Sequence, residues 1–422
     1  MFCGDDVEAV VGDVGTSLSK FGLAGEDTPK IVLPSAVGCK GSAAKTSDTD
    51  ATAAAAAYVV GDHLASRPVD LRFPVETGAV TDWDAMEQLW AHAFDRLHVD
   101  PKQHPVITSA PSSFADAERM AAAARESEKY MELMFEKMDV PCFYRAHDAV
   151  LDAFAFGRSS ALIVEIGAAA TRVVPIVDGY VLQRPVQHSA IGGDRLSEYL
   201  ERLVRQRHRA DVQPRCCVTR KVNASGKLEI VPRPDVASMP ASFLRYTTTE
   251  LFNDIRHVAC VTSPSSLSDE QLEAVAQDDR VRYELPDGHV LTLGRERYEV
   301  AEHLLHPTAE TPKCKGLPQM IYDAVHQCDA DLRRDMLGNI ILCGGGSLLP
   351  GLTERLHTEV AGLVPSAFKL RFTAVTSVER QFSCFIGGSV LASLGSFQQL
   401  WVSRREYDEV GAAQLCADRL QL

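Results

Sequence analysis

The stretch Val10-Val-Gly-Asp-Val-Gly-Thr-Ser17 decides the fold, because an apolar strand runs into an acidic residue and then into a turn of small residues. The strand-like segment Leu18–Ala24 follows, so the region predicts a β-hairpin. Working outward along the chain, the related stretch Ile163-Val-Glu-Ile-Gly-Ala-Ala169 repeats the pattern. The two acidic residues, Asp13 and Glu165, are 152 residues apart, which is the size of a domain. Two such hairpins at this spacing predict a duplicated α/β unit.

Composition narrows the class of protein. With 422 residues, of which 45% are hydrophobic and 24% charged, the chain predicts two to three globular domains. The net charge of −14 does not favour binding to a nucleic-acid backbone, and no apolar run has the length of a membrane helix. The N-terminus lacks the features of a secretory signal. Eleven scattered cysteines without a CxxC pair indicate free thiols in the cytosol or nucleus rather than disulfides or zinc sites.

The two hairpin turns carry the residues for a phosphate site. Turns of Gly, Ser and Thr leave backbone N–H groups uncovered, and such groups bind phosphate. Asp13 and Glu165 would face one cleft and could hold a hydrated Mg²⁺ ion, while Lys20 could reach the phosphates. A third turn, Gly344-Gly345-Gly346, would let a base or ribose approach the backbone. The alternative is that these glycines only form tight turns.

Four further stretches resemble actin. They are Phe73–Glu87, Tyr283–Arg297, Gly344–Arg355 and Ile386–Ser403, and the last of them, Ile-Gly-Gly-Ser-Val-Leu-Ala-Ser-Leu-Gly-Ser-Phe-Gln-Gln-Leu-Trp-Val-Ser, is highly specific. The chain resembles the actin family over nearly its full length. This resemblance implies the α/β actin/Hsp70/sugar-kinase fold, in which two duplicated α/β domains surround a nucleotide cleft.

The resemblance also implies domain boundaries. Residues 1–151 and 384–422 would form the first half, with residues 40–57 as a polar loop. Residues 152–383 would form the second half, with residues 205–239 as a polar insertion that is either an interaction surface or a solvated basic loop.

A nucleotide site and its departures from actin follow from the same resemblance. The residues implied to bind ATP are Asp13, Gly15, Thr16, Ser17, Lys20, Glu165, Gly167, Gly193, Gly344 and Gly345, with Mg²⁺ expected near Asp13 and Glu165. Ser17 stands where actin has glycine, Gln381 where it has lysine and Leu349 where it has tyrosine.

The larger departures lie around the reacting phosphate. Glu165 and Ala168 replace two aspartates of actin, Arg172 replaces a histidine that helps to order the attacking water, and Asp148 replaces the glutamine that positions it. Asp148 adds negative charge beside the γ-phosphate, and Arg172 could neutralise that charge or simply pair with Asp148 or Glu165. Because hydrolysis needs an oriented water and a metal in register, we expect ATP hydrolysis to be absent or very slow. Any bound nucleotide would clamp the two halves, and the loss of a carboxylate at Ala168 weakens the case for a nucleotide.

Two further features concern assembly. Residues 40–57, where actin has an apolar polymerisation loop, have little apolar area to bury, so we expect no self-filament. The positions that line an apolar groove in actin remain, and such a groove takes a partner's amphipathic helix. They are Tyr144, Tyr180, Ile386, Val390, Leu391, Leu394 and Leu400, of which about half are alternatively plain core.

The fit is best to the nuclear class of actin-related proteins. It rests on Phe21–Lys30, the polar 40–57 segment and the 205–239 insertion. This class implies a nuclear subunit of chromatin-remodelling or histone acetyltransferase complexes, docked on a helix of a scaffold or motor subunit, beside actin or another actin-related protein, with histones as a further partner and no membrane. The alternatives are a cytoskeletal, dynactin-like relative and an ATPase or sugar kinase of the same fold, for which Asp148 would be the candidate base.

Overall fold

The structure is a computed structural model of the whole chain. It describes residues 8–39, 58–61, 64–112, 117–209, 212–222, 228–307, 314–373 and 375–419. The expected polar loop 40–57 lies outside the described residues. No described helix is long and apolar enough to cross a membrane.

The first hairpin is the centre of a six-stranded sheet. β1 (Val10–Val14) pairs antiparallel with β2 (Leu18–Leu23), as predicted, and parallel with β9 (Val106–Ala110). The strand order is β20-β10-β9-β1-β2-β3, where β3 is Ile31–Pro34, β10 is Cys142–His147 and β20 is Val402–Ser403. The side chains of β1 are buried because the sheet is covered on both faces.

The second hairpin builds the same arrangement. β11 (Ala161–Ile166) pairs antiparallel with β12 (Thr171–Val177) and parallel with β19 (Ile340–Cys343). Beyond β12 lie β13 (Tyr180–Val181) and β14 (Gln187–Ser189). The predicted duplicated α/β fold is confirmed, since each half carries a hairpin whose first strand also pairs in parallel with a later strand.

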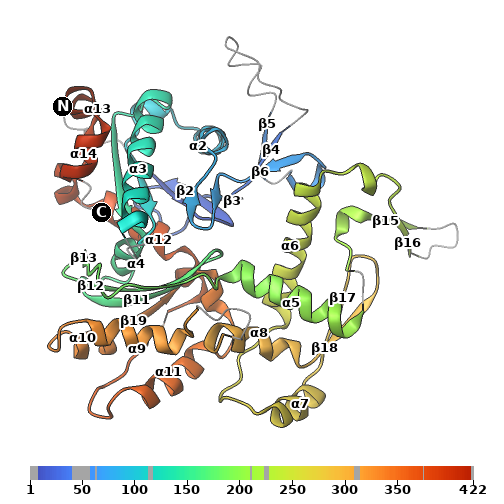
Figure 1. Ribbon diagram of the computed structural model, residues 1–422. Coiled ribbons are helices and arrows are strands. Elements are labelled where there is room, and N and C mark those ends of the chain that lie inside the picture. Colours follow the sequence, from blue (N-terminus) through green and yellow to red (C-terminus); the bar gives the residue numbers. More distant parts are fainter. Residues whose placement is uncertain are drawn as a thin grey trace.

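Two helices lie between the sheets. α4 (Asp148–Ala155) and α12 (Ser377–Ala392) pack closely on each other, and both contact strands of each half (Figure 1). The expected boundaries at residues 151 and 383 therefore fall inside helices that the two halves share.

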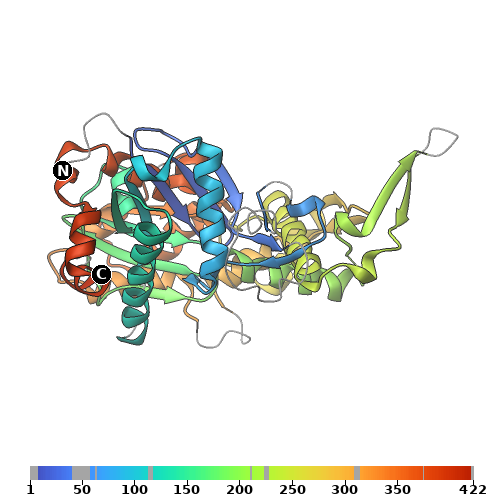
Figure 2. The ribbon, with the colours of Figure 1, turned by 90° about the horizontal axis from the view of Figure 1, so that it is seen from above.

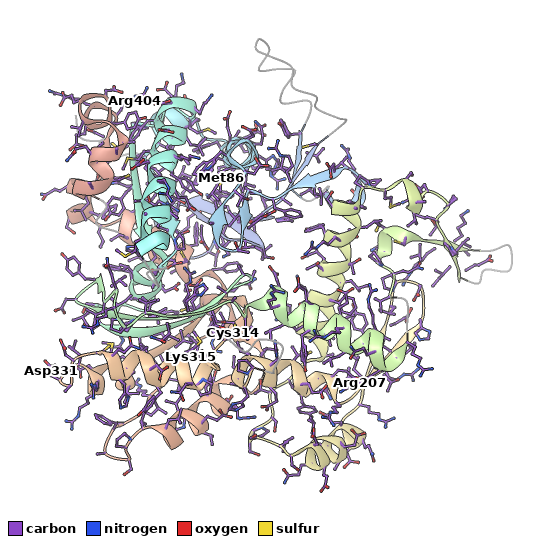
Figure 3. All side chains as sticks on the ribbon, in the orientation of Figure 1. Met86, Arg207, Cys314, Lys315, Asp331 and Arg404 are labelled. Atoms are coloured by element: carbon purple, nitrogen blue, oxygen red, sulfur yellow. The ribbon has the colours of Figure 1, made fainter. Side chains whose placement is uncertain are left out.

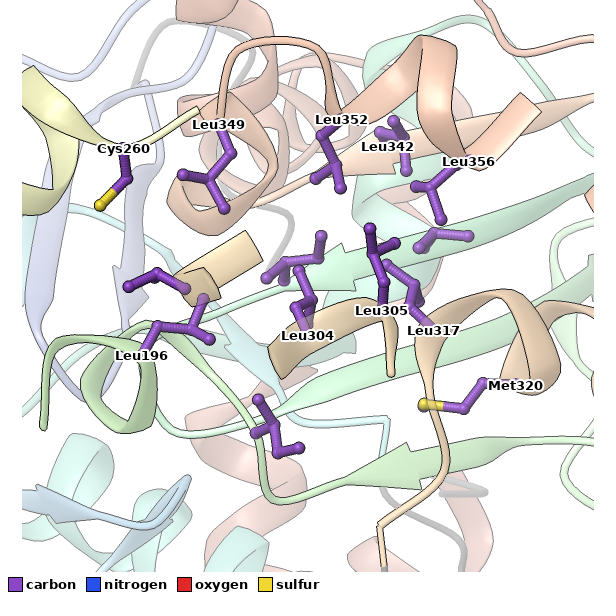
Figure 4. Packing of buried hydrophobic residues seen from close by; sticks show 14 of the residues in the cluster. Leu196, Cys260, Leu304, Leu305, Leu317, Met320, Leu342, Leu349, Leu352 and Leu356 are labelled. Carbon is purple, nitrogen blue, oxygen red and sulfur yellow. The ribbon is translucent and has the colours of Figure 1, made fainter. Parts of the chain in front are cut away.

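Each half has its own core. In the first half, Met86 on α2 (Trp83–Leu97) is fully buried, and the hydroxyl of Tyr130 on α3 (Ala117–Glu132) lies 3.5 Å from its sulfur (Figure 3). In the second half, leucines from several helices interlock beneath the sheet (Figure 4). These helices are α5 (Gly193–His208), α8 (Glu296–Leu305), α9 (Leu317–Gln327), α10 (Arg333–Gly338) and α11 (Leu352–Leu363).

The insertion 205–239 forms structure of its own. Its described residues include the end of α5 and a two-stranded ribbon, β15 (Val218–Val222) and β16 (Leu228–Pro232), that projects from the molecule (Figure 2). It leads into α6 (Ala241–Ala259), which is followed by α7 (Asp269–Asp278) and by the hairpin β17 (Val281–Glu284) and β18 (Val290–Leu293).

A small sheet of the first half meets α6 of the second. This sheet has the order β5-β4-β6, with bounds Tyr58–Val60, Val37–Cys39 and Asp70–Arg72. We call the buried group that joins the two parts the outer cluster; it comprises Ala36, Val59, Leu64, Leu71, Met239 and Phe243. Ser242 adds polar contacts, because its Oγ accepts the N–H of Leu71 at 2.9 Å and donates to Asp70 at 2.5 Å. The two halves are thus joined away from α4 and α12 as well.

Two short strands, which contribute to the cavity lining described below, and two C-terminal helices complete the named strands and α-helices. They are β7 (Val75–Glu76), β8 (Ala79–Val80), α13 (Arg404–Val410) and α14 (Ala412–Arg419).

Candidate functional site

A cavity of about 470 Å³ lies between the two hairpins. All ten residues that were expected to bind nucleotide line it: Asp13, Gly15, Thr16, Ser17, Lys20, Glu165, Gly167, Gly193, Gly344 and Gly345. The turns 15–18 and 167–170 face it from the two sheets, and we call them the first and second turns.

The two turns have the same backbone geometry. The N–H of Gly15 donates to the carbonyl of Leu18 at 3.1 Å, and the N–H of Gly167 donates to that of Ala170 at 2.9 Å. Within the described part of the chain, no acceptor contacts the N–H groups between them, those of residues 16 and 17 and of residues 168 and 169. Each turn can therefore bind an anion in the cavity through its backbone.

Three further glycines that line the cavity, Gly193, Gly344 and Gly345, have different roles. The N–H of Gly193 donates to the carbonyl of Gly167 at 2.8 Å, so Gly193 holds the second turn in place. Gly344 has a φ of 81°, and a Cβ there would lie 2.4 Å from the carbonyl of Ile166, so this position requires glycine. A Cβ on Gly345 would meet nothing within 4 Å, so Gly345 leaves open space for a ligand.

An ion pair crosses the first hairpin. Lys20 Nζ lies 2.7 Å from Asp13 Oδ2, and Ser109 Oγ donates to Asp13 Oδ1 at 2.9 Å. Burial opposes the charge on both groups, but each stabilises the other, so the pKa of Asp13 is lowered and that of Lys20 is raised. Both groups are therefore charged at neutral pH.

A second ion pair crosses the second hairpin and extends to α4. Arg172 Nη2 lies 2.5 Å from Glu165 Oε2 and 2.7 Å from Asp148 Oδ2. Asp148 Oδ1 also accepts the N–H groups of Ser112, at 3.0 Å, and Ala149, at 2.7 Å. Burial works against the charge on Arg172, yet the two carboxylates outweigh burial and raise its pKa. Arg172 therefore stays charged and joins α4 to the second sheet.

Lys20 and Arg172 occupy equivalent positions in the duplicated unit. In the strand register, Asp13 lies opposite Lys20 and Glu165 lies opposite Arg172. Both basic residues follow their acidic partners by seven residues. From the sequence, Arg172 was interpreted as a replacement for histidine that could pair with Asp148 or Glu165, and both pairs are present. Its equivalence to Lys20 could not be predicted, because that equivalence depends on the strand register.

Two carboxyl groups beside Arg172 are prone to protonation. Burial raises the pKa of Glu165 to about 7; Arg172 opposes the shift and Asp148 adds to it. Burial, and next the charge of Glu165, raise the pKa of Asp152 well above its usual value. Asp152 Oδ1 has no hydrogen-bond partner among the described residues. Asp152 was not expected from the sequence, because it sits mid-helix in an apolar pattern.

Arg256 on α6 was also missed. It is buried and lines the cavity near Gly193. Its Nε donates to Ser197 Oγ at 3.0 Å, while its Nη1 has no partner in the part of the chain that the structure describes. Burial lowers the pKa of Arg256. An unpaired buried donor is costly, so this guanidinium indicates where an acceptor group of a ligand would bind.

Comparison with known proteins identifies the family. The family model described as Actin matches residues 4–421. The chain belongs to the actin family. A protein named actin-related protein 4 from Oryza sativa subsp. indica is 35% identical over 451 residues, covering 98% of this chain and 99% of the relative. Proteins of the same name from Arabidopsis thaliana, 33% identical over 450 residues, and Yarrowia lipolytica, 32% identical over 429 residues, also cover 98% of this chain. The alignments cover 99% of the Arabidopsis protein and 96% of the Yarrowia protein. The predicted resemblance to actin-related proteins is therefore confirmed.

Membership of the actin family implies nucleotide binding, and the cavity fits a nucleotide. The uncovered N–H groups of both turns, the ammonium of Lys20 and the open backbone at Gly345 are suited to phosphates and a nucleoside.

The same cavity does not fit a magnesium ion. Asp13 and Glu165, the expected metal-facing residues, each lie against a basic side chain, and Ala168 has no oxygen to offer. Among the described residues, no group of three or more His, Cys, Asp or Glu side chains could hold a metal ion. A divalent cation would have to displace Lys20 or Arg172, both of which are positively charged.

The seven residues expected to line a partner groove separate into two sets. Tyr144, Ile386 and Leu391 pack in or against an apolar cluster of the first half. Tyr180, Val390, Leu394 and Leu400 are exposed, by 77%, 42%, 40% and 49% respectively, and we call these four the basal surface. The ring of Tyr144 packs on that of Phe397 with the centroids 4.9 Å apart, and burial, with a further contribution from Tyr180, raises the pKa of the Tyr144 hydroxyl.

Proposed function

We propose that the chain is a non-polymerising nuclear actin-related protein that serves as a structural subunit of chromatin-remodelling or histone acetyltransferase complexes. The observation that carries this proposal is the full-length similarity to proteins named actin-related protein 4, which covers 98% of the chain. A scaffold or motor subunit would hold it by a helix, beside actin or another actin-related protein. Basic histones are a further partner that suits a chain with a net charge of −14.

Absent or very slow ATP hydrolysis is part of this proposal. Asp148 stands at the water-positioning site, and its carboxylate is already engaged by two backbone N–H groups and by Arg172. Removing a water-positioning group costs orders of magnitude in rate. ATP, when bound, would then act as a structural ligand between the two turns.

Docking through the basal surface is supported by its exposure. Tyr180, Val390, Leu394 and Leu400 present apolar side chains to solvent, and burying each beneath a helix contributes roughly 1–3 kcal/mol. β13, which carries Tyr180, contacts α4, and α4 packs on α12, which carries Val390. An amphipathic helix could cover residues from both halves in this way.

The docking test uses exposed residues, so that the fold is preserved. Leu394→Asp and Val390→Asp should abolish co-purification of remodelling or acetyltransferase subunits from nuclear extract. Val378→Asp is the matched control, because Val378 is 47% exposed and lies in the first turn of α12, the helix that carries Val390. At a rise of 1.5 Å per residue, Val378 and Val390 are about 18 Å apart. Unchanged co-purification by the Leu394 and Val390 variants would contradict the docking surface.

A tagged full-length chain tests the biological setting. Mass spectrometry of its partners should recover bromodomain, acetyltransferase or Snf2-type motor subunits, and imaging should place it in the nucleus. Recovery of dynactin or filament components would favour the cytoskeletal alternative instead.

A further inference from the structure

Arg172 differs from an ordinary structural ion-pair partner in how its donors are used. Both of its ion pairs, with Asp148 and Glu165, are made through Nη2. The guanidinium also lines the cavity. Since a guanidinium carries five N–H donors in a fixed plane, Arg172 can keep its carboxylates and still bind another oxygen.

The duplication shows which oxygen that would be. Arg172 occupies in the second hairpin the register position that Lys20 occupies in the first. Each lies on the strand that leaves an anion-binding turn, with its charge held beside that turn. Two cations thus face one cavity from opposite sheets, where uncovered backbone N–H groups also converge.

The surroundings disfavour a divalent cation at this point. Asp13 and Glu165 already have basic partners, Ala168 supplies no ligand, and Arg172 would repel a divalent ion placed between Asp148 and Glu165. Asp152 also lines the cavity, but burial raises the pKa of its carboxyl well above the usual value, which makes it a weak metal ligand. A phosphate, by contrast, is attracted by Lys20 and Arg172 and needs no displacement of either.

We propose that Arg172 is a built-in cation of the phosphate site, so that this chain binds a nucleoside di- or triphosphate without a divalent metal ion. Lys20 and Arg172 hold the phosphates from the two sides, and Arg172 does so while remaining paired with Asp148. The inference rests on the proposed function, which supplies the nucleotide as ligand.

The first experiment needs no variant. The dissociation constants of ADP and ATP are measured by calorimetry on nucleotide-stripped full-length chain, once in EDTA and once in millimolar MgCl₂. We expect values that agree within about threefold, because removing the metal removes no ligand contact. A loss of tenfold or more in EDTA overturns the inference.

The second experiment assigns the effect to Arg172. Arg172→Gln should weaken binding in EDTA by more than tenfold, and MgCl₂ should restore part of the loss, because the vacated space can then admit a cation. Arg158→Gln is the control, since Arg158 is exposed on the turn after α4 and also removes one positive charge. If Arg172→Gln unfolds, the same binding measurement is made on the double variant Arg172→Gln/Glu165→Gln. This variant removes both charges of the Arg172–Glu165 ion pair and leaves neither of them unpaired.

The outcomes separate this inference from the proposed function. Nucleotide binding that depends on Mg²⁺ overturns the metal-free site and leaves the structural-subunit proposal standing. No binding of ADP or ATP in either buffer overturns the nucleotide as ligand and this inference with it, while the docking test on Leu394 remains decisive for the subunit role.

Discussion

Buried carboxyl groups couple the cavity to pH. Glu165 has an ordinary pKa of 4.5, and burial raises it to about 7 in the folded chain. Between these values the folded chain holds a proton on Glu165 that the unfolded chain has lost. The contribution of Glu165 to stability therefore falls as the pH rises from about 4.5 to 7 and is constant above that range.

Glu165→Gln tests this behaviour. The free energy of unfolding of the wild type minus that of the variant should decrease by on the order of 2 kcal/mol between pH 5 and pH 8. Urea unfolding at several pH values gives this difference, and taking the difference removes the titration of the other groups. A difference that is flat, or that rises with pH, would show that Glu165 titrates normally.

At the residue scale, the sequence predicted the cavity lining well, and it predicted the pairing of Arg172 with Asp148 or Glu165 as one alternative. Gly15, Gly167 and Gly345 could be assigned because the turns require small residues in a local pattern. The raised pKa of Asp152, and the unpaired Nη1 of Arg256, depend on contacts between residues distant in the chain. No local pattern signals these contacts.

At the scale of elements, α4 and α12, the two helices that the halves share, pack closely on each other. A Cβ on Gly387 of α12 would lie 1.7 Å from the carbonyl of Leu151 on α4, so only glycine lets the helices approach this closely. The sequence showed two glycines in an apolar helix, but it did not show what they face.

Gly387→Ala should lower the free energy of unfolding by about 3 kcal/mol, because the added methyl group must push α12 away from α4. Gly362→Ala on α11 is the control, since a Cβ there meets nothing within 4 Å. The control should change stability by no more than about 1 kcal/mol, in the stabilising direction. Thermal or denaturant unfolding measures both, and equal effects would contradict the tight contact.

The outer cluster is a second contact between elements of the two halves. Phe243 on α6 is 1% exposed and packs with Leu71 of β6, so Phe243→Ala should cost about 3 kcal/mol of packing at that point. We expect faster amide hydrogen exchange in β4 and β6, whereas Val258→Ala, which changes an exposed residue of the same helix, should leave exchange unchanged. Equal protection in the two variants would mean that the cluster does not join the halves.

The structure of the insertion, including its contact with the outer cluster, was not predicted from the sequence. Residues 205–239 were expected as an interaction surface or a solvated basic loop, because their charges hide any apolar period. The described part contains a strand ribbon, and Met239 at its end is buried in the outer cluster. A single buried residue after a polar run carries no local signal of what it packs against.

At the scale of the whole molecule, the fold was predictable because the duplication spans the chain. Two hairpins 152 residues apart and the actin-like stretches between and beyond them determine both sheets and the cavity between them. The account is therefore of an actin-family chain that keeps the two-sided phosphate cavity, while ion pairs occupy the places where hydrolysis needs a metal and an ordered water.

Phosphate release from purified, nucleotide-stripped full-length chain incubated with ATP and MgCl₂ tests this account most directly, with actin under polymerising conditions as the positive control. We expect release that is absent or far slower than that of polymerising actin, even at ATP concentrations that saturate the cavity. Sustained release at a rate comparable to that of polymerising actin would contradict it.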